Sequence, residues 1–309
     1  MNVSVIVCTY NRSGLLKGAL GTLVTQRFPK TEYEIIVIDN NSTDETEHIV
    51  TRIMENSPVE IRYMKEPKQG LSHARNTGVS EAKGRIVAFI DDDALADIYW
   101  LQEIVTTFEA LHPVPGCVGG KISPVWPADR PKWFPESMVG CLSVLDLGES
   151  PRWLCENEFV FGTNMAFLKH SVSEAGYFET HLGRKGKSLV SNEEKFLLQR
   201  LRSAGKNIYY QPKAVVKHLI PENRLRKRWV LRRFFAQGIS DYKIDILNPE
   251  RCERYSRLSH FNILTSVAGN VVRLLIGGNR ARLKNLLSIA WFSGYQYAKV
   301  TDRLRALLS

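Results

Sequence analysis

Four short apolar runs near the start of the chain constrain its fold more than any other feature. Segments with helical spacing of apolar residues lie between the first three runs, at 15–23 and 46–53. Runs that are apolar throughout are typical of strands covered on both faces, and strands that alternate with helices pair in parallel. The sequence therefore predicts an α/β fold in which helices flank a mostly parallel sheet. The four predicted strands are Val3–Cys8, Ile35–Ile38, Ile61–Met64 and Ile86–Ile90.

Three consecutive acids, Asp91, Asp92 and Asp93, directly follow the fourth predicted strand. In an extended chain residues two apart point the same way, so we expect Asp91 and Asp93 to face one site and Asp92 the other side. Clustered carboxylates repel one another unless a cation joins them, and Mg²⁺ or Mn²⁺ carrying substrate phosphates prefers such oxygen ligands. The alternative is a solvated acidic turn ahead of a helix that begins near Tyr99.

Polar segments also follow the first and second predicted strands, at Thr9–Arg12 and Asp39–Asp44. Ligands of parallel α/β sheets bind beyond the carboxyl ends of the strands, so we expect these segments and the three acids to form one site. The first segment lacks the GxGxxG of a dinucleotide-binding turn, which argues against NAD or FAD. In the second segment, Ser42 and Glu45 have the spacing of a helix capping box, which leaves Asp39 unexplained.

The rest of the chain carries weaker patterns. Residues 114–160 are rich in Pro, Gly and Trp and are predicted to be loops inserted in the sheet or packed across it. A helix is predicted from about Glu193 to Ser203, followed by a short strand at Asn207–Tyr210. Helical patterns dominate after residue 224 and include 226–237 and 280–297.

The net charge of +10 is concentrated at the C-terminal end of the chain. Residues 221–309 contain 17 Lys and Arg against 6 Asp and Glu, whereas residues 1–220 contain 25 against 26. This shift predicts a catalytic domain of residues 1–220 and a basic helical extension of residues 221–309. A basic surface is expected to meet an anionic partner, which is either a membrane face or nucleic acid.

The sequence also bears on membrane contact and location. The longest apolar segment, Phe261–Ile276, is interrupted by polar residues and falls short of the roughly 20 residues of a spanning helix. Residues 280–297 place three cations ahead of an apolar stretch, so this helix either lies on an anionic membrane or packs on the core. The chain begins without a secretory signal pattern and its five cysteines form no close pair. We expect a cytoplasmic protein with peripheral contact at the cytoplasmic face of the membrane.

Seven short motifs follow one another along residues 3–220, and they are Val3–Arg12, Ile36–Asp44, Gly70–Gly78, Ala88–Asp93, Gly162–Phe167, Gly176–Phe178, and Asn192–Glu194 ahead of Arg200–Arg202. Any one of them is a weak signal. Their order and spacing together resemble the inverting glycosyltransferases of family 2. The resemblance implies the GT-A fold, which is Rossmann-like and of the spore-coat-polysaccharide-synthase type.

The resemblance implies that the first turn and the acid after the second strand hold the base and ribose of a nucleotide-sugar. An aromatic ring such as that of Tyr10 can stack on a base, and the Asp39 carboxylate can accept from an imide N–H such as that of uracil. Arg75 lies in a segment that the family places beside the nucleotide; alternatively, it is a surface residue paired with an acid. The nucleotide-sugar-binding set so implied is Thr9, Tyr10, Asn11, Arg12, Asp39, Arg75, Asp91 and Asp92.

The resemblance also implies a divalent metal, Mn²⁺ or Mg²⁺, that neutralises the leaving diphosphate. Asp93 matches the acid nearest the metal, and His218 matches a position that often supplies a further ligand in the family. An imidazole ligand favours Mn²⁺ over Mg²⁺. Without the resemblance, a lone histidine such as His218 is more often structural.

Inversion at the anomeric carbon requires one base, which takes the proton of the acceptor hydroxyl, and no protein nucleophile. The family places this base in a Glu-Asp pair that opens a helix, and here the pair is Glu193-Glu194, which is a departure. Alignment on Arg200–Arg202 puts Glu194 at the base position, with Glu193 as the other candidate. Alternatively, both acids only stabilise the N-terminus of the helix.

The leading expectation is a metal-dependent inverting glycosyltransferase. It would move a sugar from a nucleotide-sugar, which we expect to be a UDP-sugar, to a saccharide or lipid-linked acceptor in surface polysaccharide or glycolipid biosynthesis. The three cations of Gly183–Lys187 either receive a diphosphate or belong to a solvated loop.

Two other functions compete with this expectation. A nucleotidyltransferase would carry a Gly-rich basic loop after its first strand, and Thr9–Arg12 is not such a loop. A non-catalytic transferase fold could bind membrane or nucleic acid through the basic tail, but a degenerate site should have lost its carboxylates. Nucleic acid is disfavoured because the aromatic residues of the tail lie at helical spacing instead of forming a stacking surface.

Overall fold

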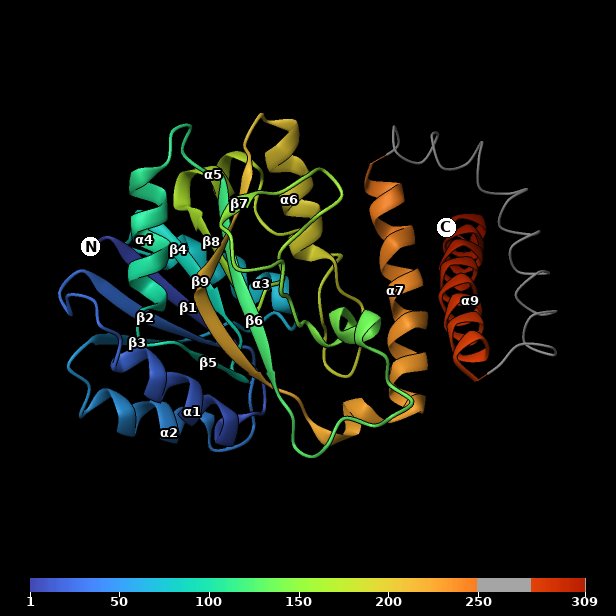
Figure 1. Ribbon diagram of the computed structural model, residues 1–309, viewed down its shortest axis with the longest axis horizontal. Helices are drawn as coiled ribbons and strands as arrows, with labels where there is room; N and C mark the ends of the chain where they lie inside the picture. The colour runs from blue at the N-terminus through green and yellow to red at the C-terminus, as the bar shows by residue number, and fades with distance from the viewer. Residues whose placement is uncertain (249–278, 309) are drawn as a thin grey trace. The chain divides into compact units, whose positions relative to one another are not determined.

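The computed structural model describes residues 1–248 and 279–308, which divide into two compact units (Figure 1). The first unit comprises Met1–Ala128, Leu142–Thr180 and Glu193–Pro221. The second comprises Asp129–Cys141, His181–Asn192 and the residues from Glu222 onward. Two short segments from the middle of the chain thus join the C-terminal residues in one unit. That residues 1–220 form a domain of their own stays a prediction.

The strands are β1 Val3–Thr9, β2 Tyr33–Asp39, β3 Glu60–Lys65, β4 Ile86–Ile90, β5 Ala94–Ala96, β6 Cys117–Val125, β7 Arg152–Trp153, β8 Asn164–Leu168 and β9 Ile208–Leu219. Within the described residues these nine strands form one sheet in the order β3-β2-β1-β4-β8-β6-β9-β5, with β7 paired to β9. The first four strands are parallel, whereas β8 and β5 run antiparallel to their neighbours. The predicted mostly parallel sheet is confirmed.

The helices of the first unit are α1 Ser13–Val24, α2 Thr46–Met54, α3 Leu71–Glu81, α4 Trp100–Ala110, α5 Lys169–Glu174 and α6 Glu193–Ser203. They cover both faces of the sheet, because side chains alternate between the faces along each strand. In β1, Val5 belongs to the apolar cluster that includes α1, α2 and α4, and its neighbour Ile6 to the cluster that includes α3, α5 and α6. The result is a helix–sheet–helix sandwich (Figure 1).

Two sequence predictions need correction. Residues 114–160 are not only loops, because 117–125 form β6 in the middle of the sheet, where the glycines and a proline weaken the strand signal. The short strand predicted at Asn207–Tyr210 is the beginning of β9, which starts at Ile208 and continues to Leu219 with alternating burial. Both strands extend the sheet beyond the parallel part that the apolar runs predict.

Two long helices dominate the second unit, α7 at Lys227–Leu247 and α9 at Asn279–Leu308, with short 3₁₀ turns at Glu136–Leu142 and Glu222–Leu225. The two helices pack closely through glycine. A Cβ added to Gly238 would lie 1.9 Å from the carbonyl oxygen of Trp291, and one added to Gly294 would lie 1.9 Å from that of Phe235. Larger residues at these two positions would force the helices apart.

Membrane spanning finds no support in the described helices, none of which is apolar enough over a sufficient length. The apolar segment Phe261–Ile276 lies outside the described residues. In α9, Leu287 is buried, whereas Leu286 is 41 % exposed. The sequence offered two alternatives for this helix, packing on the core or an apolar face on a membrane. The helix has both a buried and an exposed apolar side, so one alternative does not exclude the other.

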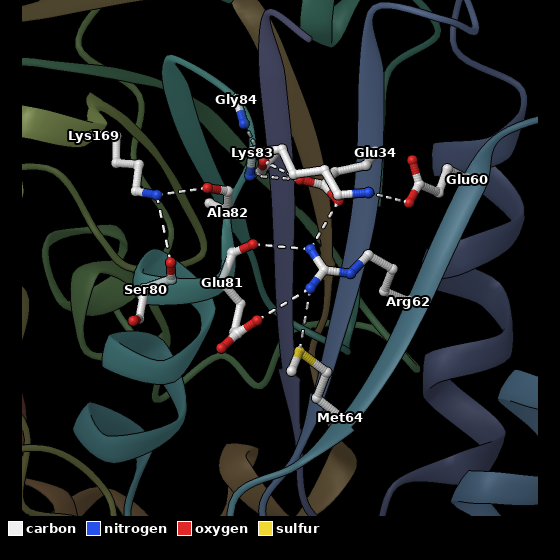
Figure 2. Close-up of polar contacts among 11 residues, drawn as sticks. Glu34, Glu60, Arg62, Met64, Ser80, Glu81, Ala82, Lys83, Gly84 and Lys169 are labelled. Atoms are coloured by element: carbon white, nitrogen blue, oxygen red, sulfur yellow. Dashed lines mark hydrogen bonds and ion pairs between the residues drawn. The ribbon is translucent and has the colours of Figure 1, made fainter.

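A buried ion network holds the amino ends of the strands together (Figure 2). Glu34 of β2 is fully buried and accepts from the Ser4 hydroxyl at 2.6 Å, from the Lys83 N–H at 2.8 Å and from Arg62 at 3.2 Å. Figure 2 shows the Arg62 guanidinium between the carboxylates of Glu34 and Glu81. This network lies at the opposite end of the parallel strands from the predicted site, so its role is structural.

We expect the Glu34→Ala variant to lose about 3 to 5 kcal/mol of unfolding free energy, because the Ser4 hydroxyl and the Lys83 N–H lose their acceptor and Arg62 is left with Glu81. The matched control is Glu60→Ala, which removes an exposed carboxylate paired with Lys83 and should cost less than about 1 kcal/mol. Urea unfolding followed by circular dichroism measures both. Equal losses in the two variants would contradict a structural role for the buried pair.

Candidate active site

The turns after β1 and β2 are joined by hydrogen bonds at the carboxyl end of the sheet. The Thr43 N–H donates to Asn11 Oδ1 at 2.7 Å, and the Asn11 N–H donates to Ser42 Oγ at 2.9 Å. Asn11 has a left-handed conformation, φ 54°, which asparagine tolerates. The predicted Ser42–Glu45 capping box is wrong: α2 begins at Thr46 without a side-chain cap, because the Ser42 hydroxyl serves the neighbouring turn.

The two residues predicted to contact a base have different surroundings. Asp39 is buried and accepts from the Ser42 N–H at 2.8 Å and from the Tyr63 hydroxyl at 2.5 Å. Burial and this carboxylate raise the pKa of Tyr63, so the phenol remains a donor. The Tyr10 side chain, in contrast, is 37 % exposed. One residue therefore offers a fixed carboxylate and the other a ring that is open to a ligand.

The three acids after β4 form a turn that a backbone hydrogen bond to the Asp91 carbonyl closes. The predicted alternation of their side chains is therefore wrong. Asp92 and Asp93 both accept from Arg12 Nη1 at 2.9 Å, and Asp92 also accepts from the Thr9 hydroxyl at 2.8 Å. Burial raises the pKa of Asp92, against the lowering effect of Arg12. The guanidinium thus compensates two clustered and buried carboxylates.

Strand β9 places His218 next to Asp93. His218 is the β-sheet partner of Ala94, and the Leu219 N–H donates to the Asp93 carbonyl at 2.8 Å. The His218 Nε2 atom lies 3.3 Å from Asp93 Oδ1, and both side chains are buried. The sheet therefore brings together the two residues that the family resemblance implies as metal ligands, although they are far apart in the sequence.

The Asp93–His218 pair fits part of a metal shell. A carboxylate oxygen and an imidazole nitrogen are both ligands that Mn²⁺ accepts. Among the residues that the structure describes, no three His, Cys, Asp or Glu side chains converge on one metal position. A metal held by this pair would complete its coordination with oxygens of water or of a bound substrate.

Arg75 is a buried residue and not a surface residue. Its Nη1 donates to Glu193 Oε1 at 2.7 Å, and its Nη2 lies 3.7 Å from Asp91. The guanidinium carbon is 5.9 Å from the ring centroid of Phe89 and 5.4 Å from that of Phe178. Burial works against the charged form, but the two carboxylates outweigh it and raise the pKa of Arg75. The arginine thus connects the acid turn after β4 with the first residue of α6.

The two acids that open α6 have different surroundings. Glu193 is 3 % exposed and holds Arg75 with one oxygen; its other oxygen, also buried, has no hydrogen-bond partner among the described residues. Glu194 is only half-buried. One carboxylate oxygen of Glu194, Oε2, is nevertheless buried. A base must reach an incoming hydroxyl, and Glu193 is engaged with the arginine, so Glu194 stays the candidate for this role.

Three residues outside the predicted set shape the site, and all lie in the Gly162–Phe167 motif. The Thr163 hydroxyl donates to Asp91 at 2.6 Å. A Cβ added to Gly162 would lie 2.1 Å from Arg75 Nη2, so a larger residue there would displace the guanidinium from its present position. Asn164 accepts from the Trp100 indole N–H at 2.8 Å and anchors the motif. The motif itself was the signal that could have identified them.

The arrangement has a clear chemical capacity. Carboxylates and a histidine, which are groups that bind cations, lie after β4 and on β9, and the half-buried Glu194 lies in the first turn of α6. The cationic Gly183–Lys187 loop belongs to the second unit, where Lys185 and Lys187 are exposed. Its predicted contact with a diphosphate stays a prediction.

Solved structures with similar folds are glycosyltransferases. A mannosyltransferase from Pyrobaculum calidifontis, solved with GDP-Man and Mn²⁺, superposes with a TM-score of 0.66 at 21 % identity over 96 % of this chain and 86 % of the other. The structure of S. aureus TarS residues 1–349 with UDP-GlcNAc gives 0.57 at 18 % identity, over 98 % and 92 %. The fold is therefore GT-A.

Sequence comparison agrees with this fold. The glucosyl-dolichyl phosphate glucuronosyltransferase of Haloferax volcanii is 29 % identical over 98 % of both chains. The succinoglycan biosynthesis protein ExoM of Rhizobium meliloti is 26 % identical over 77 % of this chain and 73 % of that one. Residues 4–175, more than half of the chain, match the family described as Glycosyl transferase family 2. The chain therefore belongs to glycosyl transferase family 2 and is a glycosyltransferase.

Proposed function

We propose that the protein transfers a sugar from a nucleoside-diphosphate sugar to a saccharide or lipid-linked acceptor with inversion at the anomeric carbon. The observation that carries the proposal is the Arg75 bridge, which connects the acid turn at Asp91 to the helix of the candidate base. A UDP-sugar is our expected donor. Relatives that act on a dolichyl phosphate and in succinoglycan biosynthesis support the acceptor class and a role in glycolipid or surface polysaccharide synthesis.

In the proposed complex, the turns after β1 and β2 and the acids after β4 bind the donor. Tyr10 stacks on the base and Asp39 accepts its imide N–H, since the ring is exposed and the carboxylate is fixed. Asp91 is the most exposed of the three acids, 34 % in its side chain, and is available to the ribose. The remaining predicted residues, among them Asn11 and Asp92, act mainly by holding these groups in place.

Asp93 and His218 would hold the divalent cation, and we expect Mn²⁺ or Mg²⁺. Such a cation supplies Lewis-acid stabilisation of the leaving diphosphate. Arg12 contacts the same carboxylate and is partly exposed, so it can also attract the diphosphate oxygens. Burial of the two ligands keeps their donor atoms in place before a metal binds.

Glu194 would act as the base that removes the acceptor hydroxyl proton while that oxygen attacks the anomeric carbon. The bond to the diphosphate breaks as the new glycosidic bond forms, and the diphosphate leaves with the electron pair. Glu193 would hold Arg75 and thereby fix the start of α6. One displacement without a covalent intermediate inverts the anomeric configuration.

We expect Glu194→Gln to lower kcat about 10²- to 10⁴-fold with unchanged donor affinity, because the amide cannot accept the proton. Glu194→Asp, which recreates the family's Glu-Asp pair, should keep measurable activity. Glu193→Gln should lose less activity but more thermal stability, because it weakens the buried pair with Arg75. Steady-state kinetics and thermal unfolding test this. If Glu193→Gln lost more kcat than Glu194→Gln and kept its stability, Glu193 would be the base and Glu194 would not.

We expect one of UDP, GDP and dTDP to bind more tightly with Mn²⁺ than without it, and UDP to be that nucleotide. Asp93→Asn should abolish the metal-dependent gain, because it removes the carboxylate charge next to His218. The matched control is Asp97→Asn, an exposed acid just after β5. Titration calorimetry measures each affinity. Metal-independent binding that Asp93→Asn leaves unchanged would rule out the proposed metal site.

We further propose peripheral contact of the second unit with an anionic membrane. Its described residues contain 18 Lys and Arg against 6 Asp and Glu, a net charge of +12. On α9, three apolar side chains at helical spacing, Tyr297, Val300 and Leu304, are more than half exposed, and Arg303 and Arg305 beside them are exposed cations. Apolar area next to cations favours the surface of an anionic bilayer. That this face of the membrane is cytoplasmic stays a prediction.

The protein should sediment with phosphatidylglycerol vesicles more than with phosphatidylcholine vesicles, and added salt should weaken the binding. The double variant Val300→Asn with Leu304→Asn should bind less, because it removes apolar area without changing charge. The control is Met54→Asn, which changes an exposed apolar side chain of the first unit. Binding to duplex DNA without binding to either vesicle would instead support a nucleic-acid partner.

A further inference from the structure

The chain enters the candidate base helix through a residue with unusual backbone geometry. Asn192 directly precedes Glu193, the first residue of α6, and has φ 80°. This left-handed conformation is costly for a residue other than glycine and persists where the surroundings fix it. Asn192 is 7 % exposed and belongs to the second unit, whereas α6 belongs to the first.

The side chain of Asn192 is held by α7 at both of its polar atoms. Its Nδ2 donates to Asp241 Oδ1 at 2.9 Å, and its Oδ1 accepts from Gln237 Nε2 at 3.0 Å. Gln237 also donates to Asp241 Oδ1 at 3.1 Å, which closes a three-residue network. A buried amide satisfied at donor and acceptor has one orientation, so the network fixes the rotamer of Asn192.

The residue before Asn192 is held by the same helix. The Ser191 N–H donates to Ser240 Oγ at 3.0 Å, and Ser240 donates in turn to the Ala236 carbonyl. Arg233 donates to the Ser191 hydroxyl at 3.0 Å. Hydrogen bonds from α7 therefore hold both the main chain and the side chain of Ser191. Together with Asn192, two successive residues before α6 are fixed in conformation.

Asp241 is the centre of the network because α9 also binds it. Its Oδ2 accepts from the Trp291 indole N–H at 2.8 Å, so N–H groups of Asn192, Gln237 and Trp291 donate to this carboxylate. The close approach at Gly238 and Gly294 lets α9 reach α7 at this level. Both oxygens of Asp241 must accept hydrogen bonds to satisfy these donors. An asparagine at this position could not satisfy them all, because one of its two terminal atoms is an N–H donor.

We propose that α7 and α9 fix the conformation of Ser191 and Asn192 so that Glu194 is presented to the acceptor, with Asp241 as the positioning residue. The inference rests on the proposed role of Glu194 as base. It gives the C-terminal helices a part in catalysis that their basic composition does not predict. A base displaced by about 1 Å can cost about 10²-fold in rate, so a fixed entry to its helix matters.

The first test compares two aspartates on α7 one turn apart. Asp241→Asn places an amide nitrogen against the N–H donors and should lower kcat about 10- to 100-fold, with donor affinity unchanged because the donor residues belong to the first unit. The matched control is Asp245→Asn, which faces the Tyr295 hydroxyl, a group that can donate or accept. It should keep nearly full activity.

A rescue separates positioning from general damage. Glycine adopts the backbone conformation of Asn192 at little cost, so Asn192→Gly added to Asp241→Asn should recover part of the lost kcat, whereas Asn192→Ala should recover none. Hydrogen–deuterium exchange should be faster at residues 191–196 in Asp241→Asn than in Asp245→Asn. All variants use the full-length protein, and thermal unfolding is recorded for each.

Equal kcat and equal exchange in the two aspartate variants would overturn the proposal. A loss of kcat in Asp241→Asn that matches a general loss of stability and donor affinity would also overturn it. Failure of the proposed function gives a different result, because Glu194→Gln would then remain active. Exchange at 191–196 still tests the positioning of the helix in that case, since it does not depend on which residue is the base.

Discussion

The buried ion pair between Arg75 and Glu193 is the interaction on which the site depends. A guanidinium that is removed from water is costly unless acids and ring faces surround it, and here two carboxylates and two phenylalanine rings do so. Gly162 leaves the space that the guanidinium occupies. Through this pair, the start of α6 and the turn after β4 are held by one arginine, which would fix the proposed donor and base positions together.

The carboxylates beside this centre pose a second problem of charge. Asp92 and Asp93 are buried side by side, and Arg12 compensates both. A guanidinium carries one positive charge against two carboxylates, and burial raises the pKa of Asp92, so a divalent cation beside Asp93 would stabilise the charged form of both acids. His218 of β9 lies against Oδ1 of Asp93, whereas Arg12 contacts Oδ2, so the imidazole offers a nitrogen ligand beside the other oxygen. The geometry thus supports the metal chemistry that the proposed transfer requires.

The two compact units differ in charge, and their segments alternate along the chain. The first unit carries every acid of the site, and its described residues hold 20 Lys and Arg against 24 Asp and Glu. The second is strongly basic, yet its hydrogen-bond network centres on a buried acid, Asp241. A segment of only twelve residues, His181–Asn192, joins this network just before α6 begins. In this unit, the exposed cations are proposed to contact a membrane, whereas the buried Asp241 network is proposed to position the start of α6.

The sequence by itself determined the parallel half of the sheet, the position of the polar segments at its carboxyl edge and the family. These follow from local apolar runs and from motifs whose residues are close in the chain. It gave no account of β6, of the turn that pairs Asp92 with Asp93, or of Ser42 as a link between turns, since each depends on partners distant in the chain. The buried state of Arg75 and the contact of His218 with Asp93 were likewise decided by tertiary structure. Patterns record which residues prefer burial or a turn, whereas contacts between distant residues appear only once the sheet and its covering helices have packed.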